Sequence, residues 1–149
     1  MALMDQLRLH PMEERMAKKK ILIVDDDPDL RAGLNIRLRA NGYDIAFAAD
    51  AMGAVAEARR HNPDLILLDL GLPGGDGFLV MQRLNMIPAL AVIPVIVLSA
   101  RDKEANENRV SMAGAVAFLQ KPYEDAALLA AIADAIGPGA SERGRRASD

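Results

Sequence analysis

Short apolar runs alternate with helix-forming segments along most of this 149-residue chain, and this alternation limits the folds that it can adopt. Four short runs are mainly apolar, and several of their residues are β-branched: residues 21–24, 64–69, 94–99 and 115–119. A weaker fifth run covers residues 43–48. Because consecutive side chains of a strand point to opposite faces, runs that are apolar throughout suit strands covered by helices on both sides.

Helical spacing fills the segments between these runs. The first helix is predicted to begin at Pro28, with Asp27 as its N-cap, and to end before Gly42. Asp50 and Asp76 are predicted to cap the next two helices. These two helices are expected at residues 51–61 and 77–87, and two more at about 102–113 and at 125–136. A regular alternation of strands and helices predicts the α/β class, with an open, doubly wound parallel sheet.

The composition excludes several functions. The chain has no cysteine, so it has no disulfide, thiolate metal site or cysteine nucleophile, and it suits a reducing compartment. Residues 21–138 have 10 basic and 16 acidic side chains, a net charge of −6, which disfavours direct binding of nucleic acid. The most apolar stretch, residues 86–100, contains two prolines and is shorter than the about 20 residues of a membrane span. Residues 1–17 lack the pattern of an export signal, so we expect a cytoplasmic protein.

Polar residues stand at the ends of the predicted strands, where open α/β sheets form their sites. These residues are Asp25, Asp26, Asp27, Asp69, Ser99 and Lys121. Carboxylates held close together repel one another unless a cation lies among them, and oxygen ligands without His or Cys favour Mg²⁺. A metal, a hydroxyl and a lysine together suit a phosphoryl group, and a carboxylate beside them can attack phosphorus to form an acyl phosphate.

The same positions resemble the receiver domain of bacterial two-component response regulators, and in particular the single-domain chemotaxis regulator. The matching segments are Val24-Asp25-Asp26, Leu68-Asp69, Leu72-Pro73, Asp76-Gly77, Val97-Leu98-Ser99-Ala100 and Phe118-Leu119-Gln120-Lys121-Pro122. The resemblance covers about residues 18–137 and implies a flavodoxin-like sheet of five strands in the order 2-1-3-4-5. We therefore expect a receiver domain at 18–137, a flexible extension at 1–17 and a disordered tail at 138–149, so that the chain is either a stand-alone receiver or a fragment of a longer regulator.

The resemblance implies a role for each of the polar positions. Asp69 would be the phosphoacceptor, and Mg²⁺ would be held by Asp25, Asp26, Asp69 and the backbone carbonyl of Gly71. Lys121 would pair with the carboxylate and later with the phosphoryl oxygens, and the bond between Lys121 and Pro122 would be cis.

Two further residues would form the switch. Ser99 would hydrogen-bond the phosphoryl group and move toward it on activation, and Phe118 would turn inward as Ser99 moves. This movement would alter the face built from the fourth helix, fifth strand and fifth helix, where a downstream protein would read it. The phosphoryl donor would be a sensor histidine kinase or a histidine phosphotransfer protein. Beyond catalysing its own phosphorylation and dephosphorylation, the chain would not be an enzyme.

Other interpretations fit single residues. Asp27 before Pro28 fits a helix cap, and Phe118 in an apolar strand fits a core residue. Tyr123 and His61 have no assigned role. The run Asp25-Asp26-Asp27 also fits the paired aspartates of a Mg²⁺-dependent phosphatase of the haloacid-dehalogenase type, although no acidic pair follows Lys121 closely. A receiver-fold scaffold that works without phosphorylation is the third alternative.

Overall fold

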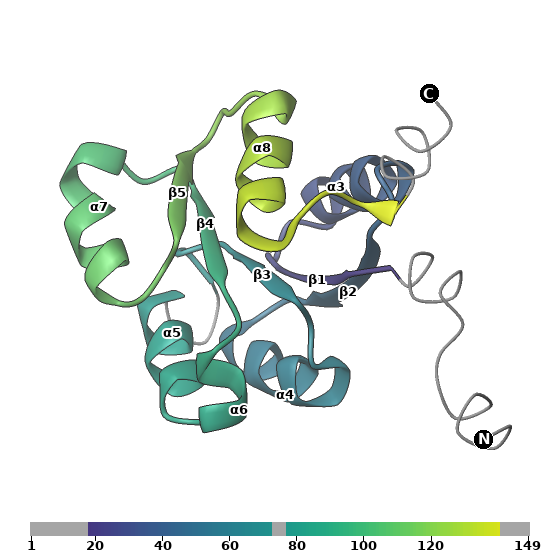
Figure 1. Ribbon diagram of the computed structural model, residues 1–149. Coiled ribbons are helices and arrows are strands. Elements are labelled where there is room, and N and C mark those ends of the chain that lie inside the picture. The colour runs from purple at the N-terminus through teal and green to yellow at the C-terminus, as the bar shows by residue number, and fades with distance from the viewer. Residues whose placement is uncertain (1–17, 73–76, 141–149) are drawn as a thin grey trace, which may run out of the picture.

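A computed structural model describes residues 18–72 and 77–140, which form three layers with one central sheet (Figure 1). The five strands are β1 (Lys20–Val24), β2 (Asp44–Ala48), β3 (Leu65–Leu68), β4 (Val95–Ser99) and β5 (Ala117–Gln120). All neighbouring strands are parallel, and their order is β2-β1-β3-β4-β5. The predicted fold class and strand order are therefore confirmed.

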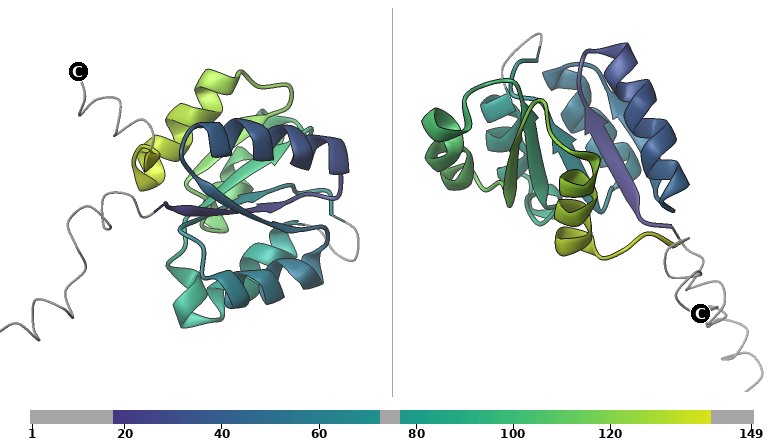
Figure 2. Two further views of the ribbon diagram at one scale, coloured as in Figure 1. Left: turned by 90° about the vertical axis from the view of Figure 1, so that its right-hand side faces the viewer. Right: turned by 90° about the horizontal axis from the view of Figure 1, so that it is seen from above.

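Helices cover both faces of this sheet. They are α3 (Pro28–Ala40), α4 (Ala51–His61), α5 (Gly77–Asn85), α6 (Pro88–Ala91), α7 (Lys103–Met112) and α8 (Asp125–Ile136). Figure 2 shows the sheet edge-on, with α3 and α8 on one face and α4, α5 and α6 on the other. No helix in the described part of the chain combines the length and the apolar character of a membrane span.

The central strands separate two apolar cores. Leu22, Ile66 and Val97 belong to the core beneath α4 and α5, whereas their neighbours Ile23 and Leu67 belong to the core beneath α3 and α8. Alternate residues of each strand thus enter opposite cores, which is why β1, β3 and β4 are apolar at almost every position.

Side-chain caps begin two of the helices as predicted. The carboxylate of Asp27 accepts hydrogen bonds from the backbone N–H groups of Asp29 and Leu30, and Pro28 is the first residue of α3. Asp50 accepts from the N–H of Gly53 at the start of α4. The predicted cap Asp76 lies outside the described residues, as does the expected extension at 1–17.

The structure corrects the third predicted helix, which was expected to continue to residue 87. α5 ends at Asn85, and a separate short helix, α6, begins at Pro88. Ile87 between them is extended, with φ −110° and ψ 109°. The ring of a following proline disfavours the helical conformation, so Ile87 leaves the helix and Pro88 begins the next one.

The packed chain extends three residues past the expected boundary at 137. The hydroxyl of Tyr43 donates to the carbonyl of Gly137 at 2.9 Å, and the N–H of Ala140 donates to the carbonyl of Gly42 at 3.2 Å. Gly139 between them is buried. The segment after α8 therefore lies along the turn between α3 and β2.

Candidate functional site

The candidate site lies at the carboxyl ends of β1 and β3, which end at the same level. Val24 pairs with Leu68 in the parallel register, so Asp25 and Asp69 leave the sheet side by side. The N–H of Asp25 donates to Ala48 and that of Asp69 donates to Val24, which holds both residues to the strand edge. The backbone of the sheet thus places Asp25 and Asp69 side by side, independently of their side-chain contacts.

Three carboxylates gather at this edge. Oxygen atoms of Asp25, Asp26 and Asp69 all lie within 4.8 Å of one another. Asp25 is buried, Asp69 is half-buried and Asp26 is exposed. A set of oxygen donors without nitrogen or sulfur suits a hard divalent ion, so these residues fit Mg²⁺.

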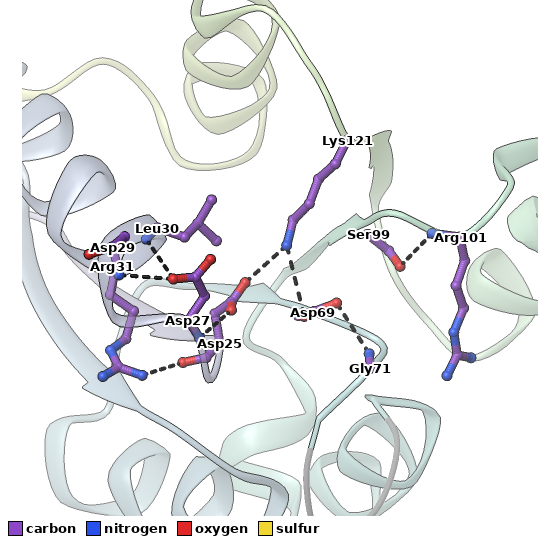
Figure 3. A network of polar contacts seen from close by, with 10 residues as sticks. All are labelled: Asp25, Asp27, Asp29, Leu30, Arg31, Asp69, Gly71, Ser99, Arg101 and Lys121. Atoms are coloured by element: carbon purple, nitrogen blue, oxygen red, sulfur yellow. Dashed lines mark hydrogen bonds and ion pairs between the residues drawn. The ribbon is translucent and has the colours of Figure 1, made fainter.

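Lys121 reaches this acidic cluster from the end of β5 (Figure 3). Its Nζ lies 3.1 Å from Oδ2 of Asp25 and 3.8 Å from Oδ2 of Asp69. Its backbone N–H donates to the carbonyl of Ser99 at 2.8 Å, and the following bond to Pro122 is cis, as predicted. The ammonium therefore lies between the two carboxylates and is closer to Asp25.

Burial distinguishes Asp25 from Asp69, although each accepts one similar backbone hydrogen bond. Oδ1 of Asp25 accepts from the N–H of Asp27 at 2.9 Å, and Oδ1 of Asp69 accepts from the N–H of Gly71 at 3.1 Å. The side chain of Asp25 is 4% exposed and that of Asp69 is 14% exposed. Asp25 is thus enclosed by its partners, whereas Asp69 can be reached from solvent.

Arg31 is a residue of this region that the sequence did not indicate. Its guanidinium reaches back from α3 and donates to the carbonyl of Asp25 at 2.7 Å. The two residues are six positions apart, and no spacing rule predicts such a contact. Only the path of the chain from β1 into α3 brings them together.

Among the described residues, no hydrogen bond joins either of the two predicted switch residues to the carboxylates. Ser99 is 1% exposed at the end of β4, and its Oγ accepts from the N–H of Arg101 at 3.1 Å. Phe118 is 6% exposed in β5 and belongs to the core beneath α4 and α5. The ring is therefore already packed inward while the Ser99 hydroxyl contacts its own loop.

Asp27 does not join the acidic cluster. Its carboxylate is used as the cap of α3, and the candidate metal ligands are Asp25, Asp26 and Asp69. The haloacid-dehalogenase alternative rests on paired aspartates within this run. The structure directs Asp27 toward the helix instead.

An open cleft of about 690 Å³ lies beside the site, between α3 and the segment that leads from β5 to α8. Tyr123 lines this cleft together with Arg37, Lys121 and Asp125. Burial, followed by the nearby carboxylates of Asp25 and Asp125, raises the pKa of Tyr123 above 10.0, although Arg37 lowers it in part. Tyr123 thus stays a neutral phenol beside the acidic cluster.

Comparison with known sequences identifies the family. The sequence model of the response regulator receiver domain matches residues 21–133. The DNA-binding dual master transcriptional regulator RpaA of Synechocystis is 40% identical over 113 residues, which are 76% of this chain and 47% of RpaA. Response regulator PleD of Caulobacter vibrioides is 39% identical over 114 residues, 76% of this chain and 25% of PleD. Protein PilH of Pseudomonas aeruginosa is 34% identical over 113 residues, 76% of this chain and 93% of PilH.

Solved structures agree with this result. Chemotaxis protein CheY4 of Vibrio cholerae has a TM-score of 0.75 and 27% identity, and the match covers 80% of this chain and 99% of CheY4. The receiver domain of sensor histidine kinase PA1611 of Pseudomonas aeruginosa has a TM-score of 0.74 and 30% identity, and the match covers 81% of this chain and 99% of the PA1611 domain. The PA1611 domain was solved with a magnesium ion coordinated in its active-site cleft.

The fold and the site together define a flavodoxin-like α/β domain with an acidic cluster and a lysine at the carboxyl ends of its strands. The chain belongs to the receiver domain family of response regulators in two-component systems. Receiver domains are phosphorylatable signalling switches rather than conventional enzymes, and the family binds Mg²⁺ in its acidic site. The chain spans about half the length of RpaA and a quarter of PleD, so those proteins contain further segments.

Proposed function

We propose that this domain accepts a phosphoryl group on Asp69 from a phosphohistidine of a sensor histidine kinase or a histidine phosphotransfer protein. The observation that carries the proposal is the position of Asp69 beside two other carboxylates and 3.8 Å from the ammonium of Lys121. Of the two carboxylates that Lys121 contacts, Asp69 is the more exposed. A phosphodonor on another protein can therefore reach Asp69 more easily than Asp25.

The proposed reaction is a transfer between two nucleophiles. An Oδ atom of Asp69 attacks phosphorus, an O–P bond forms as the N–P bond breaks, and the imidazole of the donor leaves. The N–H of Gly71 holds the other oxygen of Asp69, which orients the attacking one. Lys121 is placed to neutralise charge on the phosphoryl oxygens. In dephosphorylation, water attacks phosphorus and the Asp69 carboxylate leaves, which restores the starting state and releases phosphate.

Asp25, Asp26 and Asp69, with the carbonyl of Gly71, are the residues that would hold Mg²⁺. The donor set fits, since it consists of oxygen atoms alone. A bound Mg²⁺ supplies positive charge where negative charge collects on the phosphoryl oxygens. The ammonium of Lys121, held 3.1 Å from the buried Asp25, supplies a second positive charge at the same place.

Signalling is proposed to follow from the movement of Ser99. Its oxygen now accepts from the N–H of Arg101, and a phosphoryl group on Asp69 would offer an acceptor to its O–H. The segment around Arg101 leads directly into α7, and Phe118 lies with Val110 of α7 around a pocket of about 120 Å³. A change at Ser99 would thus reach the face of α7, β5 and α8, where a downstream protein would bind.

The setting of this switch is also part of the proposal. We infer one receiver domain, formed by residues 18–137 together with the packed residues 138–140, and place it in the cytoplasm because a chain without cysteine suits a reducing compartment. The net charge of −6 over residues 21–138 makes protein contacts, rather than DNA contacts, the direct output of the domain. The scaffold alternative, in which the fold works without phosphorylation, is the one that the following experiment tests.

Intact-mass measurement after incubation with acetyl phosphate tests the assignment. With Mg²⁺, the wild-type chain is expected to gain one phosphoryl group or to release phosphate from acetyl phosphate, and to do neither without Mg²⁺. Asp69→Asn should abolish both because an amide oxygen is a poor nucleophile. This change keeps the shape of the side chain and its acceptor for the Gly71 N–H.

Asp64→Asn is the matched control because Asp64 immediately precedes the opposite end of β3 and is exposed. It should behave as the wild type does. Labelling that persists in Asp69→Asn would contradict the choice of phosphoacceptor. If the folded wild type shows no adduct and no Mg²⁺-dependent release of phosphate, the scaffold alternative would be favoured.

A further inference from the structure

Asp25 is held through its backbone as well as through its carboxylate, and the guanidinium of Arg31 is one of the groups that hold it. The N–H of Asp25 donates to Ala48 at 3.1 Å, and its carboxylate oxygens accept from the N–H of Asp27 and the ammonium of Lys121. Its carbonyl accepts from Nη1 of Arg31 at 2.7 Å, the shortest of these four contacts. Figure 3 shows Arg31 and Lys121 on opposite sides of Asp25.

Arg31 supplies a donor that the sheet does not offer. β1 ends at Val24, which forms the last pairs of the parallel register with Ala48 and Leu68. The carbonyl of Asp25 lies beyond this point, and among the described residues no backbone N–H donates to it. Asp25 is 3% exposed, and a buried polar group without a partner costs about 1–3 kcal/mol. The guanidinium of Arg31 thus takes the place of a missing strand neighbour.

The same contact also orients Asp26, the next residue of the acidic cluster. The carbonyl of Asp25 and the N–H of Asp26 belong to one planar peptide unit, so a donor bound to that carbonyl sets the orientation of the whole unit. The carboxylate of Asp26 is exposed and accepts no hydrogen bond from the residues that the structure describes, yet it lies within 4.8 Å of those of Asp25 and Asp69. The backbone, rather than a side-chain partner, therefore sets the position of Asp26.

The stability of α3 does not explain the placement of this arginine. Arg31 lies near the N-terminus of α3, where the partial positive charge of the helix end disfavours a cation. Its guanidinium forms no ion pair with a carboxylate in the described part of the chain. Because it binds a carbonyl instead, it holds Asp25 without occupying the carboxylate oxygens that a cation would need.

We propose that Arg31 is a positioning residue for the Mg²⁺ site, because its bond to the Asp25 carbonyl holds Asp25 and Asp26 in the arrangement that binds the ion. This inference rests on the proposed function, which assigns the acidic cluster to Mg²⁺. Removing a group that holds metal ligands in place typically costs about ten-fold or more in metal affinity. Removing Arg31 also removes a positive charge near the ion, which by itself would raise the affinity. The direction of the change therefore distinguishes positioning from charge.

Titration of the isotope-labelled full chain with magnesium chloride, at constant ionic strength, tests the proposal without a phosphodonor. The amide NMR signals of Asp27 and Gly71 report the ion, because their N–H groups donate to the carboxylates of Asp25 and Asp69. Arg31→Met should raise the dissociation constant for Mg²⁺ about ten-fold. Arg31→Lys keeps the charge but replaces the planar guanidinium by a compact ammonium, so it should raise the constant by a smaller factor.

Arg39→Met is the matched control. Arg39 lies on the same helix, and its guanidinium donates to the carbonyl of Ile45 at 3.3 Å. Ile45 lies near the start of β2, away from the strand ends that form the site. Arg31→Met and Arg39→Met each remove one positive charge and one contact between a guanidinium and a carbonyl, but they release different carbonyls. Arg39→Met should bind Mg²⁺ as the wild type does.

A purely structural role of Arg31 would lower the free energy of unfolding in urea and leave the Mg²⁺ affinity of the folded chain unchanged. A folded Arg31→Met variant that binds Mg²⁺ as tightly as the wild type, or more tightly, would therefore overturn the proposal. If Arg31→Met does not fold, an unchanged affinity in Arg31→Lys would overturn it, as would a wild type that binds no Mg²⁺. A wild type that binds Mg²⁺ but is not phosphorylated on Asp69 would contradict only the proposed phosphoacceptor, and the affinities would still decide the role of Arg31.

Discussion

Asp25 and Asp69 have the same side chain, but the fold gives them different surroundings. Asp25 is enclosed, with the Lys121 ammonium at 3.1 Å and the N–H of Asp27 at 2.9 Å. Asp69 is more exposed and lies farther from the same ammonium. This asymmetry follows from the loops, because the chain after Asp25 turns into α3 whereas the chain after Asp69 continues past the exposed Gly71. The proposed division between a metal ligand and a nucleophile therefore rests on local geometry.

A glycine maintains the close packing behind Asp69. A Cβ atom at Gly77 would lie 2.8 Å from the carbonyl oxygen of Asp69 and 2.8 Å from Cα of Leu70. Both are backbone atoms, which cannot move aside cheaply, so Gly77→Ala should lower the free energy of unfolding by about 1–3 kcal/mol.

Urea unfolding measures this effect, with Gly33→Ala as the control. A Cβ at Gly33 would meet only the flexible end of Arg37 at 3.3 Å, and Ala favours the helix by up to about 1 kcal/mol. Gly33→Ala should therefore be as stable as the wild type or more stable. If Gly77→Ala is as stable as the wild type, the backbone around Asp69 and Leu70 can move aside, which would contradict the predicted clash.

Tyr123 provides a test at alkaline pH. Burial raises the pKa of Tyr123 in the folded protein above 10.0, so the unfolded chain loses this proton first as the pH rises. Stability linked to the neutral phenol is thus complete below about pH 10 and is lost as the pH rises through the folded-state pKa.

Tyr123→Phe lacks this ionisable group. The free energy of unfolding of the wild type should therefore fall relative to that of the variant between about pH 8 and about pH 11. Urea unfolding at the two pH values measures it, and Tyr43 is present in both proteins. A difference that is the same at both pH values would contradict the raised pKa.

At the scale of elements, α7 is the least firmly packed of the longer helices. Val110 is its only residue that is buried, and most of its other residues are polar. The guanidinium of Arg109 over the ring of Phe78 and the bond from Asn85 to Ala113 add two further attachments to α5. A helix held by so few contacts can shift at low cost, which suits the proposed path from Ser99 to the reader face.

Arg109→Ala should loosen α7 selectively. Loss of the contact with Phe78 should speed amide hydrogen exchange in α7 by about two- to five-fold. Arg60→Ala is the control, since Arg60 is exposed on α4 and has no ring contact among the described residues. Exchange in α7 that does not change in Arg109→Ala, or that changes equally in Arg60→Ala, would contradict this account of its attachment.

The elements could be predicted from the sequence where local chemistry decides them. Consecutive apolar residues predicted the central strands, and Asp27 and Asp50 predicted the starts of α3 and α4. The break at Ile87 was missed because the apolar pattern continues through Pro88 without change. The path of residues 138–140 was missed too, because it depends on contacts with Gly42 and Tyr43, almost one hundred positions earlier in the chain.

At the scale of the whole molecule, the site could be located but not detailed from the sequence. The rule that sites form at the carboxyl ends of parallel strands brought Asp25, Asp69 and Lys121 together correctly. It could not say that Lys121 lies closer to Asp25, or that Ser99 contacts Arg101 rather than the carboxylates. Those details depend on side-chain packing between distant elements.

The most direct test of the central claim is to locate the phosphoryl group. The chain is phosphorylated with acetyl phosphate and Mg²⁺ and then treated with sodium borohydride, which reduces an acyl phosphate to an alcohol and so converts aspartate to homoserine. Peptide mass spectrometry then identifies the converted residue. We predict homoserine at position 69 alone. Homoserine at position 25 or 26, or phosphate retained on a residue that borohydride does not reduce, would contradict the account.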